Sequence, residues 1–155
     1  MLAGVSIVRG LHMEAETPEG FLKHAQEFCE AAELVCKDDS TVSLPGYFLL
    51  GRSVELSLKA FLLKCGFTVK TLRSRPYGHD LRQLLQAAQE NGLANYVDIG
   101  KLEGASIHLL SHDYVTKRLE YRQTGQEYAL PFLAITIRIT RELAYGLSEF
   151  CVPEA

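Results

Sequence analysis

The sequence lacks the features that mark several classes of protein. It has no tryptophan and only five prolines among its 155 residues. It also has no run of about 18 uncharged apolar residues that could span a membrane. Lys and Arg together number 16 against 19 Asp and Glu, so the net charge is −3. A general basic excess is therefore absent, and any binding of nucleic acid must be local.

The sequence also has few residues in patterns that form disulfides or bind metals. Its four cysteines show no C-x-x-C spacing and lie in segments with helical patterns. This usage is typical of reduced core thiols in a cytoplasmic protein. His108 and His112 have the spacing of zinc ligands on one helical face, but no third ligand is evident. We therefore expect no metal site and no cofactor.

The length of the chain suits one domain with a single core. The first residues, MLAGVSIVRGLHMEAETPEG, have an apolar run that is broken by Arg9 and followed by acids. This pattern is unlike a signal peptide. We expect an N-terminal arm over residues 1–16, one helical domain over residues 17–150, and a cytoplasmic location.

Capping residues and apolar spacing predict helices along the whole domain. Thr17-Pro18-Glu19 is a typical helix start, and the first helix is expected to end near Lys37. The second, expected over 47–64, is apolar around most of its circumference, which is typical of a central helix. Its polar strip consists of Arg52, Glu55 and Lys59.

Further helices are expected after a glycine that ends the second. Gly66 fits a C-terminal cap, the segment 67–78 is predicted as a loop, and Asp80 fits the cap of a third helix. Helical patterns return over 99–122 and over 131–150. The fold class is therefore predicted as all-α, an up-and-down antiparallel bundle of four to five helices.

Three sequence motifs carry a resemblance to a known family. ELSLKAFLLKCG begins at Glu55, GHDLRQLL begins at Gly78, and Tyr114-x-x-x-Arg118-x-x-Tyr121-Arg122 follows. In this order they resemble the HEPN superfamily (higher eukaryotes and prokaryotes nucleotide-binding domain) over about residues 17–150. The resemblance implies a helical bundle and frequent homodimers. It further implies either a metal-independent RNase or a non-catalytic module that accompanies small nucleotidyltransferases or binds nucleotides or RNA.

The RNases of this superfamily carry Arg-x(4–6)-His where the last helices meet, and this chain departs from that pattern. No histidine follows His112, and the one matching spacing, from Arg73 to His79, lies before the third predicted helix. We therefore expect a HEPN-like non-catalytic or degenerate module that binds a nucleotide, RNA or a protein partner. The partner implied by the resemblance is a small nucleotidyltransferase. The alternative is a metal-independent RNase or toxin of a toxin–antitoxin system, with Arg73 or Arg75 acting beside His79.

Two groups of basic residues are candidate phosphate contacts. Arg118, Tyr121 and Arg122 place an aromatic ring among arginines, a combination that binds nucleotide bases and phosphates. Arg73 and Arg75 lie in the predicted basic loop. In both cases the alternative is an ordinary packed or solvated segment.

Two acidic residues also have alternative interpretations. Glu55 with Arg52 and Lys59 forms either a salt-bridged strip or a polar pocket or dimer seam. Asp80 either orients His79 for acid–base chemistry or caps the following helix, while His79 makes local contacts.

Overall fold

The computed structural model describes residues 15–37 and 41–154, and every regular element in these ranges is helical. The five longer helices are α1 (Pro18–Val35), α2 (Leu44–Lys64), α4 (Leu81–Glu90), α5 (Lys101–Val115) and α6 (Leu133–Gly146). Two short helices, α3 (Val69–Arg73) and α7 (Ser148–Cys151), and a 3₁₀ turn at Leu93–Asn95 complete the structure. The predicted all-α bundle is confirmed. The arm predicted over 1–16 lies outside the described residues, apart from Ala15 and Glu16.

The first two helices begin where side-chain oxygens cap them. The Thr17 hydroxyl accepts a hydrogen bond from the backbone N–H of Gly20, as predicted. α2 begins three residues earlier than predicted, because Ser43 caps it in the same way by accepting from Gly46. Pro45 falls in its first turn, where a missing backbone N–H leaves no bond unmade.

The end of α2 agrees with the prediction, whereas the segment after it does not. Gly66 has a positive φ of 107°, and the N–H of Phe67 donates to the carbonyl of Leu62, which closes the helix. The segment 67–78, predicted as a loop, contains α3. The loop prediction was wrong because Thr68 caps this helix and Leu72 anchors it in the core.

The last part of the chain is more interrupted than its apolar spacing predicts. Helical structure was expected to Arg122, but α5 ends at Val115, and Lys117 adopts a left-handed conformation with φ 62°. The helix predicted over 131–150 is divided at Leu147 into α6 and α7. The early end of α5 reflects a tertiary contact that overrides local helical preference, because Oδ2 of Asp113 accepts from the backbone N–H of Ala129.

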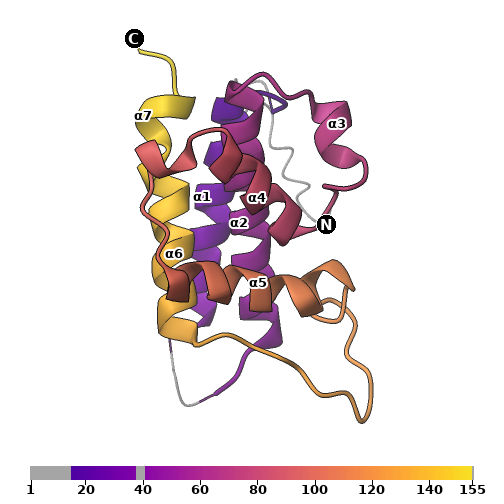
Figure 1. Ribbon diagram of the computed structural model, residues 1–155. Helices are drawn as coiled ribbons and strands as arrows, with labels where there is room; N and C mark the ends of the chain where they lie inside the picture. The colour runs from indigo at the N-terminus through magenta and orange to yellow at the C-terminus, as the bar shows by residue number, and fades with distance from the viewer. Residues whose placement is uncertain (1–14, 38–40, 155) are drawn as a thin grey trace, which may run out of the picture.

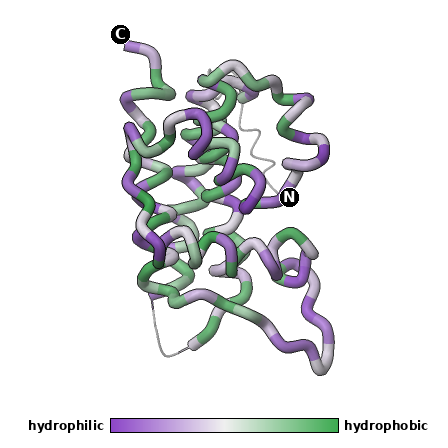
Figure 2. Tube along the Cα trace, in the orientation of Figure 1, coloured by the Kyte–Doolittle hydropathy of each residue, from purple (hydrophilic) through white to green (hydrophobic). Residues whose placement is uncertain are grey.

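α2 forms the centre of the bundle. In Figure 1, α1, α2 and α6 lie side by side while α5 crosses them, and α2 contacts α1, α4, α5, α6 and α7. From Gly51 to Leu62 every residue of α2 except Arg52 is buried, which confirms it as the central helix. Figure 2 shows the hydrophilic far end of the connection from α5 to α6 and its hydrophobic return to the bundle.

The cysteines contribute to this core as expected. None of the four forms a disulfide in the described structure; Cys29, Cys36 and Cys151 are buried and Cys65 is half-buried. Within the described ranges, no helix combines the length and the apolar character that crossing a membrane requires.

Candidate functional site

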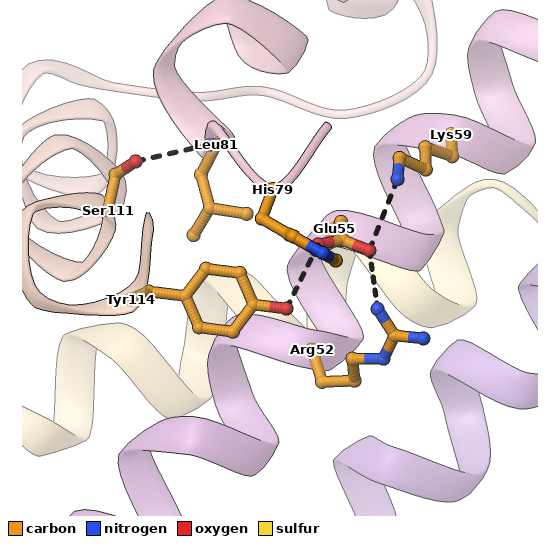
Figure 3. Close-up of polar contacts among 7 residues, drawn as sticks. All are labelled: Arg52, Glu55, Lys59, His79, Leu81, Ser111 and Tyr114. Carbon is orange, nitrogen blue, oxygen red and sulfur yellow. Dashed lines mark hydrogen bonds and ion pairs between the residues drawn. The ribbon is translucent and has the colours of Figure 1, made fainter. Parts of the chain in front are cut away.

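One carboxylate on the central helix, that of Glu55, is buried in the core and contacts four polar side chains. Glu55 is only 1% exposed. Its Oε2 lies 2.6 Å from Nη1 of Arg52 and 3.3 Å from Nζ of Lys59. Its Oε1 accepts from the Tyr114 hydroxyl at 3.0 Å and lies 2.6 Å from Nδ1 of His79 (Figure 3). Both carboxylate oxygens are therefore fully used, as a buried charge requires.

The four partners come from three parts of the fold. Arg52 and Lys59 stand three residues before and four residues after Glu55 on α2, so both ion pairs that the sequence spacing allows are present. His79 immediately precedes the cap of α4, and Tyr114 lies in the last turn of α5. Burial, and then the Glu55 charge, raises the pKa of Tyr114, so its hydroxyl stays protonated and donates.

His79 is held with one ring nitrogen towards the carboxylate. An ionised carboxylate only accepts hydrogen bonds, so Nδ1 of His79 carries the proton in this contact. Its side chain is 53% exposed, and within the described residues Nε2 has no hydrogen-bond partner. In the neutral ring this nitrogen is an acceptor on a half-exposed side chain, which resembles the arrangement by which a carboxylate orients a histidine base.

A pocket of about 290 Å³ opens beside this network. We call it the basic pocket. One part of its lining is polar and mainly basic, and the other is apolar. The lining residues are Ala15, Glu16, Phe21, His24, Arg52, Glu55, Leu56, Lys59, Val69, Leu72, Arg73 and His79.

Lys59 lines this pocket with most of its hydrogen-bonding capacity unused. Its side chain is 6% exposed, and Glu55 is its one acceptor among residues 15–37 and 41–154. An ammonium has three donors. Burial lowers the pKa of Lys59; the nearby Glu55 carboxylate opposes that effect, and the charges of Arg52 and Arg73 reinforce it. The amine is therefore under-satisfied in the described structure and suited to an added acceptor.

Of the two arginines predicted in the basic loop, only Arg73 lines the pocket. Its Nη2 lies 2.8 Å from Oε1 of Glu16, and both side chains are mostly exposed. Such a surface pair contributes little to stability and exchanges readily with solvent or ligand. Arg75 is exposed beyond α3, with no hydrogen-bond or ion-pair partner in the described chain.

The structure places Arg118, Tyr121 and Arg122 away from the basic pocket, and none of the three lines it. Arg118 is engaged within the fold: its Nη1 lies 3.1 Å from Oδ1 of buried Asp113, and its guanidinium lies over the ring of Tyr128. It also donates to the carbonyl of Glu127 and so fastens the connection that follows α5. Tyr121 and Arg122 are exposed, and neither side chain has a hydrogen-bond or ion-pair partner among the residues described.

The remaining sequence candidates occupy separate positions. Asp80 caps α4 by accepting from Arg82 and Gln83, so the carboxylate that meets His79 is Glu55 rather than its neighbour. His108 and His112 are exposed on α5. In the described part of the chain, no three metal-ligating side chains converge.

Most of the residues that line the pocket were not predicted from the sequence, and neither was the contact of Tyr114 with Glu55. Tyr114 fits the apolar spacing of α5, and Phe21 and His24 lie in a helix identified only by its start and its buried stripe. Tyr114 begins the aromatic-basic motif in the sequence, but that motif does not indicate its contact with Glu55. No local signal distinguishes Phe21 and His24, because their roles depend on which helices meet. Comparisons with models of protein families, with curated proteins and with solved structures find no match for this chain.

Proposed function

We propose that the chain binds a nucleotide or an RNA strand, with a phosphate group in the basic pocket. The observation that carries this proposal is the Lys59 ammonium, which lines the pocket with a single acceptor among the described residues. Anionic phosphate oxygens are strong acceptors for such a buried donor. Arg52 and Arg73 line the same pocket and add positive charge, although the chain as a whole is acidic.

The apolar part of the pocket supports a ligand with a base or sugar beside its phosphate. Phe21 and His24 from α1 and Leu72 from α3 all line it. Aromatic side chains stack on bases of any sequence, which gives sequence-tolerant binding of single strands. The pocket is large enough for one nucleotide unit and is at the small end of ligand sites.

The resemblance to the HEPN superfamily supports the same ligand class. It also implies a homodimer and a small nucleotidyltransferase as partner, and both of these stay predictions. Because the basic pocket is formed by one chain, the proposed binding requires neither partner.

Paired variants test whether phosphate binds in the basic pocket or near Arg122. We expect Lys59→Met and Arg73→Ala to weaken binding of a fluorescein-labelled single-stranded RNA by about tenfold to a hundredfold, the effect of one charge-assisted hydrogen bond. Arg122→Ala removes an exposed arginine outside the pocket and is the matched control. Fluorescence anisotropy at fixed salt measures all three, and circular dichroism checks that each variant folds. Loss of binding in Arg122→Ala alone would place the site on the other surface.

A second function, metal-independent RNA cleavage, is favoured by one specific observation. The contact of His79 Nδ1 with Glu55 leaves Nε2 of a neutral ring beside a pocket that also contains Arg73. In this proposal Nε2 takes a proton from a 2′-hydroxyl, while a cation balances the charge that develops on the phosphate.

The cleavage assay uses purified protein and single-stranded RNA in the presence of EDTA. If this function is correct, RNA is cleaved, His79→Ala abolishes cleavage, and Glu55→Gln reduces it by weakening the orientation of the ring. Intact RNA with the unaltered protein, at a concentration that saturates binding, would exclude it and leave the binding function in place.

A further inference from the structure

Lys59 differs from the other lysine of α2 because its side chain is buried and lines a pocket. Its neighbour Lys64 on the same helix is exposed, whereas Lys59 is buried and lines the basic pocket. Lysines become nucleophiles when burial and adjacent cations disfavour the ammonium form. Here the burial is observed and is the largest cause that lowers the pKa of Lys59; the Glu55 carboxylate at 3.3 Å opposes it, and Arg52 and Arg73 supply the adjacent cations.

The buried carboxylate does not require the charge of Lys59. Arg52 contacts the same Oε2 at 2.6 Å, closer than the 3.3 Å of Lys59. Tyr114 and His79 occupy the other carboxylate oxygen. If Lys59 is neutral, Glu55 therefore keeps a paired guanidinium and two hydrogen-bond contacts.

From this geometry we infer that Lys59 is a nucleophilic amine that forms an imine with an aldehyde carried by a phosphate-bearing ligand of the basic pocket. The inference rests on the proposed phosphate binding. In this arrangement the phosphate lies beside Arg52 and Arg73, and the aldehyde of the ligand, rather than a phosphate oxygen, meets Nζ of Lys59. The pocket volume of about 290 Å³ limits the enclosed part of the ligand to a small group rather than a long chain.

The reaction balances without an oxidant, a reductant or a metal. The ammonium releases a proton to solvent, and the Nζ lone pair forms a bond to the aldehyde carbon. The carbonyl oxygen takes up protons and leaves as water while the C=N bond forms. One ammonium and one aldehyde thus give one iminium ion and one water molecule.

The test uses glyceraldehyde 3-phosphate, with glyceraldehyde as the probe that lacks a phosphate. Each is incubated with the full chain at limiting concentration, the imine is reduced with borohydride, and labelled residues are located by peptide mass spectrometry. We expect the phosphorylated probe to label Lys59 about tenfold to a hundredfold more than glyceraldehyde does, the gain from one charge-assisted contact. Inorganic phosphate should protect Lys59.

Two variants separate a specific site from general lysine chemistry. Lys59→Arg keeps the positive charge but removes the nucleophile, so most of the label should disappear. Lys64→Arg removes the exposed lysine of the same helix and should leave the labelling of Lys59 unchanged. The mapping on the unaltered protein remains decisive if Lys59→Arg fails to fold.

The possible results distinguish the two proposals. Label distributed among exposed lysines, with Lys59 unmodified, would overturn the imine proposal. If RNA or phosphate still binds under those conditions, the proposed function stands without it. If phosphate neither binds nor protects and Lys59 reacts equally with both aldehydes, the pocket holds a reactive amine but not the phosphate site.

Discussion

Removal of the buried carboxylate is expected to destabilise the protein strongly. Glu55→Ala deletes the group that compensates the 6%-exposed Lys59 and accepts from the Tyr114 hydroxyl. Breaking a buried ion pair by removing one partner costs about 3–5 kcal/mol, because the other charge is left uncompensated. Arg52 and His79 add less to this loss, because they are 30% and 53% exposed and water replaces the contact.

The measurement is the free energy of unfolding from urea denaturation at neutral pH. A loss of about 3–5 kcal/mol is a large part of the 5–15 kcal/mol that a domain of this kind possesses. Glu55→Gln is the matched variant: it keeps the side-chain volume and an acceptor for Tyr114 but removes the charge, and it should lose less than Glu55→Ala.

A double variant examines the cause of the loss. In Glu55→Met with Lys59→Met, both buried charges are replaced by apolar groups of similar length, so most of the stability should return. If the free energy of unfolding of Glu55→Ala lies within about 1 kcal/mol of the parent value, the change is that of an average substitution. The contacts of Glu55 would then not stabilise the fold as a buried ion pair does. If the double variant is no more stable than Glu55→Ala, the loss comes from packing instead.

Three other expectations concern packing, pH and assembly. A methyl group at Gly51 would lie 2.6 Å from Cδ2 of Tyr114, so Gly51→Ala should lower the unfolding free energy in urea by about 1–3 kcal/mol; a more stable variant would contradict this contact. Burial raises the pKa of Cys151 from 9.0 to about 12. As the pH rises from about 9 to about 12, the Cys151 thiol loses its proton in the unfolded chain before it does in the folded one. The free energy of unfolding therefore falls over this pH range. The melting temperature of Cys151→Ala should fall less steeply with pH there, and equal slopes would argue against the effect. The homodimer implied by the HEPN resemblance predicts twice the chain mass in light scattering, and a monomer would refute it.

Helix starts and the central position of α2 could be predicted because their causes are local. The Thr17 and Asp80 caps involve backbone groups two or three residues away, and Gly66 acts within its own turn. Burial around the whole of α2 follows from its apolar circumference. Such signals can be recognised in the sequence because they do not depend on tertiary contacts.

The errors arise where a distant residue determines the local structure. α5 ends at Val115 because Asp113 accepts from Ala129, 16 residues later, and pairs with Arg118, so the chain turns back. α3 is only five residues long, and the apolar contact that fixes it is the single buried Leu72. Neither contact leaves a periodic pattern in the sequence.

The candidate site divides in the same way. Its ion pairs along α2 are spaced three and four residues apart and could be expected from the sequence. The contacts of Glu55 with His79 and Tyr114 span 24 and 59 residues, so no spacing rule reaches them. The sequence therefore indicates a polar strip, and only the packing of α2 against α5 and the loop before α4 turns it into an enclosed network.

The placement of that network argues for a function at this position rather than for stability alone. A well-packed apolar side chain at position 55 would serve a helical bundle equally well, since buried ion pairs are often no more stabilising than apolar replacements. The network also opens at one edge: His79 is half exposed, and Lys59 lines a pocket with donors to spare. Natural proteins break the local rules of core composition mainly at functional sites. The buried carboxylate is thus best explained by the two groups it holds at the pocket, a histidine and an amine, and those are the residues to test first.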